Sequence, residues 1–194
     1  MAALRLSNVG FSTNADRGMG CGIHPRDKQF CAERLGHSAL TIVNNRSEFS
    51  AWRSPSYVSA ATISGGGESD AHPGGSAAVS VEVTLRDVGA GGLKTDVYPH
   101  NWAALHDRCN GSSMYPGTCG WAAIQLAGGA WVNASVAVSG TTRLTLTAEV
   151  AELQDALHLR GPPTATAYGW APVPMMNAYE VGTGLPVLPW NRSI

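Results

Sequence analysis

Regular alternation of apolar and polar residues in the middle of the chain most constrains its fold. In AVSVEVTLRDV, residues 78–88, the valines and the leucine occupy every second position, with Ser, Glu, Thr and Arg between them. A period of two places one set of side chains on a core and the other on the opposite face of a strand. Three further strand-like stretches follow at short intervals: WAAIQLA (121–127), AWVNASVAV (130–138) and TRLTLTAEV (142–150).

Short turn sequences connect these stretches. Gly128-Gly129 joins the first two of the three, and Ser139-Gly140-Thr141 joins the next two, so we expect a meander of hairpins. TATAYGWAPV, residues 164–173, is a further expected strand, whereas 153–159 fits either a short helix or an edge strand. SGGGESDAHPGGS, residues 64–76, is expected to be a long flexible turn. Several short strands in a chain with 23 Gly and 11 Pro predict a mainly β fold, an antiparallel β-sandwich spanning residues 46–194.

The N-terminal part has a different pattern. Pro25 suits the first turn of a helix, where its missing N–H costs nothing. The following residues place Phe30, Leu35, Leu40 and Val43 on one stripe, which predicts an amphipathic helix over 25–43. We expect loop before this helix and an extended linker over residues 44–57.

Composition excludes several classes of partner. Only 14% of the 194 residues are charged and the formal net charge is −1, so we expect no electrostatic capture of nucleic acid or of a membrane surface. No apolar run approaches the length needed to cross a bilayer. His100 and His106 lie near Asp96 and Asp107, but without a recurring ligand spacing we interpret them as a polar loop and expect no metal.

His24 is the residue of greatest chemical interest. It stands in GCGIHPRDKQF, directly before the helix-starting Pro25. A neutral imidazole can accept a hydroxyl proton and act as a general base. A His at the mouth of a helix can equally serve as a local hydrogen-bonding group, and local features alone favour that structural role.

Two blocks resemble the sialate O-acetylesterase family of SGNH-type serine esterases. I-H-P-R-D-K-Q, followed by a helix with Ala-Glu-Arg-Leu, is similar to the family's last conserved block, in which the His is the catalytic base. AYGWAPVPMMNAYEVGTGLPVLPW resembles the family's closing segment, with an Asn-x-Tyr, a Gly-Leu-Pro and a Pro-aromatic pair. The two blocks occur in the family's order and together cover about 45 residues.

The resemblance implies a catalytic mechanism and a substrate class. His24 would activate a serine that attacks an O-acetyl ester on sialic acid or a related sugar, and water would then cleave the acetyl-enzyme. No cofactor is implied. Residues 1–45 would be a remnant of the α/β hydrolase core, including its catalytic-His block and helix.

The chain departs from the family where the nucleophile is concerned. Ser7 and Ser12 precede His24 without the spacing of a nucleophile elbow. Asp16 is the only carboxylate before His24 and is therefore the candidate for the orienting acid, although we expect a solvated loop residue. We interpret the chain as the C-terminal part of such an esterase, inactive alone. The alternative is a non-catalytic β-sandwich module that binds glycan or protein.

Two features indicate an extracellular or lumenal protein. Cys109 and Cys119 bracket a Gly-, Ser- and Pro-containing loop and would pair in an oxidising compartment, with two unrelated thiols as the alternative. Four glycosylation sequons begin at Asn45, Asn110, Asn133 and Asn191. We therefore expect the complete protein to be secreted or to reside in a lysosomal or other endomembrane lumen. MAALRLSNVG lacks the long apolar core of a signal peptide, so we expect no export signal in the chain as written.

The aromatic residues divide into core and surface candidates. Trp102 and Tyr115 lie in expected loops and are candidates for contact with a glycan. Trp121 and Trp131 are expected in the core. Trp170 and Trp190 are expected to pack the closing segment together.

Overall fold

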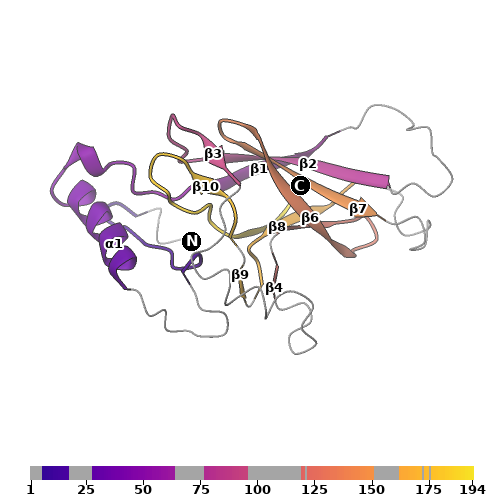
Figure 1. The fold of residues 1–194 in the computed structure, drawn as a ribbon, viewed down its shortest axis with the longest axis horizontal. Coiled ribbons are helices and arrows are strands. Elements are labelled where there is room, and N and C mark those ends of the chain that lie inside the picture. The colour runs from indigo at the N-terminus through magenta and orange to yellow at the C-terminus, as the bar shows by residue number, and fades with distance from the viewer. Residues whose placement is uncertain are drawn as a thin grey trace.

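The computed structural model describes residues 6–17, 28–63, 77–95, 119–120, 122–150, 162–171, 173–174 and 176–194. Within these ranges the chain forms one α-helix, one short 3-10 helix and several strands (Figure 1). In chain order they are α1 (Gln29–Ile42), η2 (Ser47–Phe49), β1 (Ser56–Thr62), β2 (Ala77–Arg86), β3 (Leu93–Lys94), β4 (Cys119–Gly120), β5 (Ala122–Gln125), β6 (Trp131–Gly140), β7 (Arg143–Val150), β8 (Ala165–Tyr168), β9 (Val173–Pro174), β10 (Tyr179–Glu180) and β11 (Trp190–Ser193).

Seven strands form one antiparallel sheet in the order β1-β2-β7-β6-β5-β8-β11. The β5–β6 and β6–β7 pairs are the hairpins that the Gly-containing turns predict. Gly129 has φ +85° in the first of these turns, a backbone conformation that glycine adopts without steric cost. Two small pairs, β10 with β3 and β4 with β9, lie outside this sheet.

The sheet curls until its two edge strands approach each other. Strand β6 pairs with β5 through residues 131–134 and with β7 from residue 135 onward, so it belongs to both halves of the sheet. Across the open edges, the Tyr57 hydroxyl of β1 donates to the Ser193 carbonyl of β11 over 3.3 Å. The backbone N–H of Leu188 donates to the carbonyl of Pro55 over 2.8 Å. The prediction of a mainly β, antiparallel fold is confirmed, and the seven strands form one nearly closed sheet. The β-sandwich with two facing sheets and the remnant of a hydrolase core are not confirmed and stay predictions.

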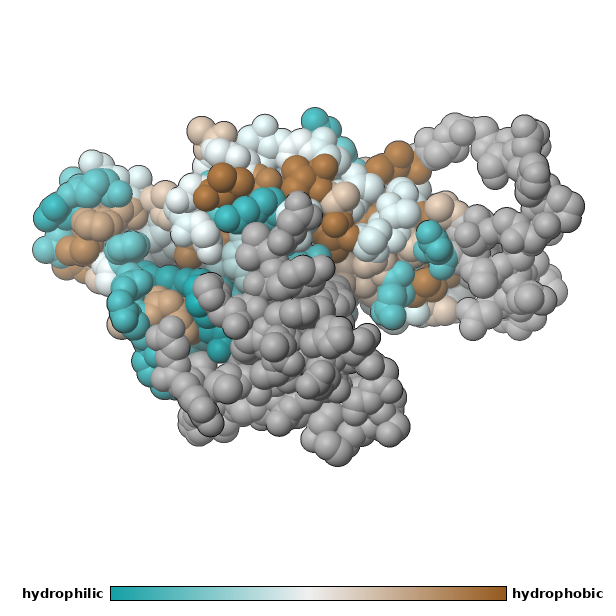
Figure 2. Space-filling model, in the orientation of Figure 1, coloured by the Kyte–Doolittle hydropathy of each residue, from teal (hydrophilic) through white to brown (hydrophobic). Residues whose placement is uncertain are grey.

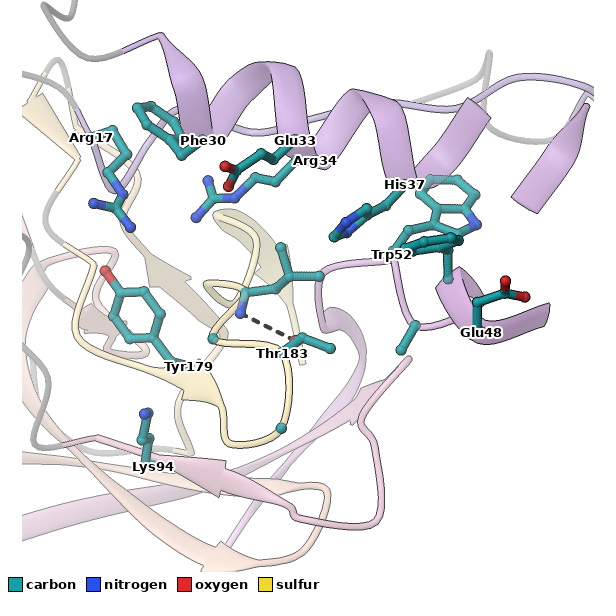
Figure 3. A pocket seen from close by; sticks show the side chains of 15 residues that line it. Arg17, Phe30, Glu33, Arg34, His37, Glu48, Trp52, Lys94, Tyr179 and Thr183 are labelled. Atoms are coloured by element: carbon teal, nitrogen blue, oxygen red, sulfur yellow. Dashed lines mark hydrogen bonds between the residues drawn. The ribbon is translucent and has the colours of Figure 1, made fainter. Parts of the chain in front are cut away.

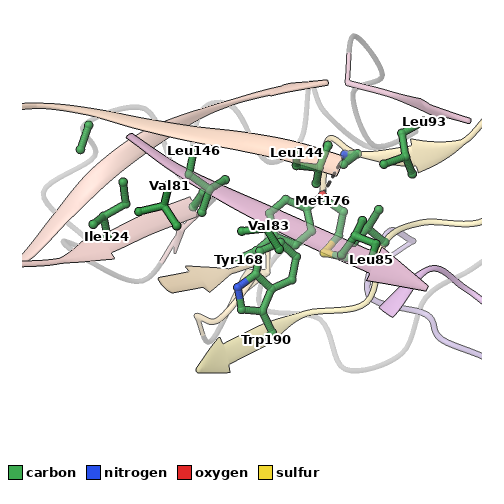
Figure 4. Packing of buried hydrophobic residues seen from close by; sticks show 14 of the residues in the cluster. Val81, Val83, Leu85, Leu93, Ile124, Leu144, Leu146, Tyr168, Met176 and Trp190 are labelled. Atoms are coloured by element: carbon green, nitrogen blue, oxygen red, sulfur yellow. Dashed lines mark hydrogen bonds between the residues drawn. The ribbon is translucent and has the colours of Figure 1, made fainter. Parts of the chain in front are cut away.

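The core lies on the inner face of the curled sheet (Figure 4). Alternate residues of β2 and β7 supply its centre, because Val81, Val83, Leu144 and Leu146 are all fully buried. Burial of each such side chain contributes about 1.5–3 kcal/mol to folding. The period-two pattern of these two strands therefore predicts the core correctly.

The closing segment is fastened to the sheet by aromatic packing and hydrogen bonds. The Trp190 ring stacks on Tyr168 at 4.8 Å between ring centroids, and its indole N–H donates to the Thr166 hydroxyl over 3.1 Å. Trp190 therefore packs as expected. Trp170 directly follows Gly169, which has a positive φ. It does not pack in the closing segment as expected, because 63% of its surface is exposed.

Trp131 is a second correction. It begins β6 and is 43% exposed rather than buried in the core. The half-buried residues of β6 that pack against the core are Val132, Ala134 and Val136, so Trp131 falls on the opposite face of the strand. Trp121 lies outside the described residues.

Helix α1 begins later than the sequence pattern suggests, at Gln29, and its predicted start at Pro25 lies outside the described residues. Phe30 is buried and Leu40 half-buried, whereas Leu35 and Val43 are 46% and 78% exposed. Only part of the predicted apolar stripe is therefore covered. No helix in the described part of the chain combines the length and apolar character that crossing a membrane requires.

Strand β1 was not predicted. Its first two residues, Ser56 and Tyr57, fall in the stretch 44–57 expected to be a linker, and the rest of the strand follows that stretch. The strand occupies one edge of the sheet and only residues 56, 57 and 60 are half-buried, so it lacks a regular apolar alternation. The stretches 64–76 and 153–159 lie outside the described residues.

Candidate functional site

A pocket of about 620 Å³ lies between α1 and the β10 region (Figure 3). Its roof comes from α1, its floor from β3, β10 and the following turn, and one end from the segment after η2. On the face shown in Figure 2, hydrophilic residues predominate around the end of the molecule that carries α1. The lining residues are Arg17, Phe30, Glu33, Arg34, His37, Glu48, Phe49, Ala51, Trp52, Lys94, Tyr179, Gly182, Thr183, Gly184 and Leu185.

A buried ion pair fixes the N-terminal loop to the helix above the pocket. Arg34 of α1 donates to both carboxylate oxygens of Asp16, each over 2.8 Å, and also to the Thr13 carbonyl over 2.6 Å. Asp16 is 1% exposed. The expectation of a solvated loop residue is therefore wrong, since the carboxylate is needed to balance a largely buried guanidinium. Its candidate role beside His24 stays a prediction, because His24 lies outside the described residues.

Arg17 is held less completely than Arg34. Its Nε lies 3.5 Å from an oxygen of Asp16, and its guanidinium lies over the Phe30 ring at 4.9 Å. Arg34 contacts the same ring at 5.1 Å, so Phe30 carries two cations against its face. The Nε atom of Arg17 is buried and has no hydrogen-bond partner among the residues that the structure describes.

Tyr179 brings a second unpartnered polar atom to this end of the pocket. The residue is 5% exposed, and within the described ranges its buried hydroxyl has no hydrogen-bond partner. Burial raises the pKa of Tyr179 well above its usual value, and the negative charge of Asp16 acts in the same direction. The hydroxyl is therefore protonated near neutral pH and can donate a hydrogen bond. Figure 3 shows it pointing toward the Arg17 guanidinium.

The opposite end of the pocket is aromatic and acidic. His37 stacks on Phe49 with ring centroids 4.9 Å apart. Glu33 accepts a hydrogen bond from the Gln29 amide over 2.7 Å and lies on the Phe30 side of the pocket, whereas Glu48 pairs with Arg46 at the opposite end (Figure 3). This end therefore presents hydrogen-bond acceptors, whereas the Arg17 end presents donors.

A tight turn after β10 forms the floor. The Glu180 carboxylate accepts hydrogen bonds from the backbone N–H and the hydroxyl of Thr183. Although burial opposes ionisation, these hydrogen bonds and the nearby charge of Lys94 lower the pKa of Glu180. Glu180 is thus an ionised residue that holds the turn.

Several residues proposed from sequence cannot be placed in this geometry. His24, Trp102, Tyr115, Cys109 and Asn110 lie outside the described residues, as do His100 and His106. Cys119 is in β4, but its side chain is not described, so the Cys109–Cys119 disulfide stays a prediction.

The three other sequon residues are described. Asn45 and Asn133 are exposed and Asn191 is half-buried in β11. Exposure makes the first two accessible to modification, and glycosylation stays a prediction. Within the described residues, no group of three His, Cys, Asp or Glu side chains is placed to hold a metal ion.

The pocket itself was missed from the sequence. Arg17 follows Asp16 in an irregular stretch, and nothing in its neighbourhood suggests a site. Tyr179 belongs to the Asn-x-Tyr of the closing segment, the one signal that could have drawn attention to it. The two residues are far apart in the sequence and meet only through the packing of the N-terminal loop against β10 (Figure 3).

Comparison with known proteins gives a likeness among solved structures. No protein-family model matches the chain, and no curated protein matches it. Among solved structures, it is similar to XAC1771, described as a novel carbohydrate acetylesterase from Xanthomonas citri, with a TM-score of 0.51 and 18% sequence identity. The match covers 88% of this chain and 29% of that chain. The fold is therefore like that of part of a carbohydrate acetylesterase, and the chain spans less than a third of that protein's length.

Proposed function

We propose that this chain is the C-terminal part of a carbohydrate O-acetylesterase. Residues 1–45 would supply the catalytic-His block and a helix of the hydrolase core, and residues 46–194 the β domain. The complete enzyme would remove O-acetyl groups from sialic acid or a related sugar in the secretory or lysosomal lumen. The nucleophilic serine and the oxyanion donors would lie outside this chain.

The fold likeness to a carbohydrate acetylesterase over 88% of the chain carries the proposal. This structural likeness is independent of the two sequence blocks, whose resemblance to the sialate O-acetylesterases rests on the amino-acid sequence alone. Fold alone does not fix an activity. The agreement of the two lines on one substrate class supports the esterase.

The outer face of α1 gives further support. Leu35 and Val43 are exposed on a helix whose apolar stripe is otherwise covered at Phe30. Exposed large apolar residues in one stripe are typical of a surface that packs against another part of the protein. A hydrolase core placed there would bury them.

The proposed chemistry needs one role from this chain. The imidazole of His24 would take the proton of the serine hydroxyl as the serine oxygen attacks the acetyl carbonyl carbon. The protonated imidazole would then return the proton to the departing sugar oxygen. A water activated by the same imidazole would release acetate and restore the serine.

The test compares two purified proteins. One is the 194-residue chain, and the other extends it with the reading frame encoded upstream of Met1. Acetate release is measured with O-acetylated sialic acid and with an acetyl ester of an aromatic alcohol. We expect release only from the extended protein. A frame that encodes no serine hydrolase core, or acetate release by the 194-residue chain itself, would contradict the proposal.

The alternative function remains a non-catalytic β module that binds glycan or protein. The aromatic and polar pocket between α1 and β10 favours it. This alternative predicts no acetate release from either protein, together with glycan binding by the 194-residue chain. Loss of that binding in Trp102→Ala would place the contact in the predicted loop rather than in the pocket.

A further inference from the structure

Two buried donors at one end of the pocket lack acceptors. The Tyr179 hydroxyl and the Arg17 Nε are both buried without a hydrogen-bond partner within the described part of the chain. Leaving such groups unpaired costs stability, and most buried polar atoms in proteins are satisfied. Their position on the wall of a pocket suggests that a ligand supplies the acceptor (Figure 3).

The charges around these donors favour an anion. Arg34 is neutralised, because Asp16 accepts two of its hydrogen bonds and Thr13 a third. In the described part of the chain, the acidic partner of Arg17 is Asp16 at 3.5 Å, and Lys94 lines the same end of the pocket. A planar guanidinium with free N–H groups matches the two oxygens of a carboxylate.

The far end of the pocket favours a polyhydroxylated ligand. Glu48 lines it and pairs with Arg46 through Oε1. Carboxylates accept hydrogen bonds from sugar hydroxyls. They also repel an anion with several charges, which disfavours a phosphate compound. The Phe49 ring, stacked on His37 at this end, offers apolar surface, whereas the Phe30 ring lies under Arg17 and Arg34 at the other end.

We propose that this pocket binds a sugar carboxylate, with the carboxylate accepting hydrogen bonds from Arg17 and Tyr179. The sugar hydroxyls then face Glu48 at the far end. A volume of about 620 Å³ accommodates one or two sugar rings. The site uses only side chains of this chain and requires no turnover.

Calorimetric titration of the 194-residue chain with D-glucuronate tests the site, with D-glucose as the neutral counterpart. We expect glucuronate to bind and glucose to bind at least about tenfold more weakly. Tyr179→Phe and Arg17→Gln should each weaken glucuronate binding by about tenfold or more. Arg192→Gln, an exposed arginine on β11, should leave it unchanged.

Three results would overturn the site: no glucuronate binding, equal binding of glucose, or unchanged affinity in Tyr179→Phe. Displacement of glucuronate by an equal concentration of inorganic phosphate would overturn the assignment to a sugar. Tyr179→Phe removes a hydroxyl with no hydrogen-bond partner among the described residues, so it should fold even if Arg17→Gln does not. Glucuronate binding is measured on the 194-residue chain, which we expect to release no acetate. A failure of the binding test therefore says nothing about the esterase proposal, and a failure of the esterase test says nothing about the pocket.

Discussion

The guanidinium of Arg34 and the carboxylate of Asp16 form a buried pair with two parallel hydrogen bonds of 2.8 Å. The pair joins the loop before α1 to the helix itself. It also determines the charge balance of the pocket, because it neutralises Arg34 and leaves Arg17 as the incompletely paired cation.

Asp16→Asn should destabilise the protein by about 3 kcal/mol, because it leaves the Arg34 charge buried without its partner. Arg143→Met breaks the partly exposed Arg143–Glu82 pair and should cost less than about 1 kcal/mol. Urea denaturation of both variants gives the two free energies of unfolding. Equal costs would show that the Asp16–Arg34 pair is not a buried clamp.

Two tyrosines should respond oppositely to loss of the hydroxyl. The Tyr168 hydroxyl accepts hydrogen bonds from the backbone N–H groups of Asn177 and Ala178, at 2.9 and 2.8 Å. Tyr168→Phe leaves these buried donors unpaired and should cost about 1–3 kcal/mol. Tyr179→Phe removes a hydroxyl that has no partner in the described part of the chain and should leave the free energy of unfolding unchanged or higher. A larger loss in Tyr179→Phe than in Tyr168→Phe would be incompatible with the structure.

Stability should fall in alkaline solution. Burial is the main cause that raises the pKa of both Tyr168 and Tyr179 in the folded protein. A raised pKa favours the neutral phenol in the folded state, so this stabilisation is complete below the unfolded pKa of about 10 and is lost as the pH rises further. Unfolding free energies measured across this range should decline above pH about 10, and less steeply in Tyr179→Phe. A flat profile would contradict the burial of both rings.

Leu146→Ala should create a cavity at the centre of the core and cost about 2–5 kcal/mol. Val138→Ala on neighbouring β6 removes methyl groups from a residue that is 40% exposed and should cost less than about 1 kcal/mol. Thermal unfolding of the pair measures the difference. Similar costs would indicate that β7 does not face the core as described.

The strands with regular alternation could be predicted from sequence because each side chain's face follows from its position. Val81, Val83, Leu144 and Leu146 are buried as the pattern requires. Trp131 shows the limit of judging by residue type, since its position in β6 places a large apolar ring on the outer face. Edge strand β1 has no regular alternation of apolar and polar residues, so the sequence pattern does not predict it.

The pocket depends on contacts between distant segments, which the sequence pattern does not encode. Asp16 could be identified as the only carboxylate before His24, but its burial depends on Arg34 two turns into the predicted helix region. In the sequence, Tyr179 does not differ from the other aromatic residues. The structure distinguishes it, because its buried hydroxyl has no hydrogen-bond partner among the described residues. Long-range packing and unsatisfied hydrogen bonds are properties of the fold.

The most direct test of the esterase proposal is kcat/KM for acetate release from an O-acetylated sugar by the protein extended upstream of Met1. His24→Ala should lower it at least about a thousandfold, as expected for loss of the general base. His72→Ala, in the Gly-rich stretch 64–76, is the matched control and should leave it unchanged. Full acetate release by the His24→Ala enzyme would contradict the proposal.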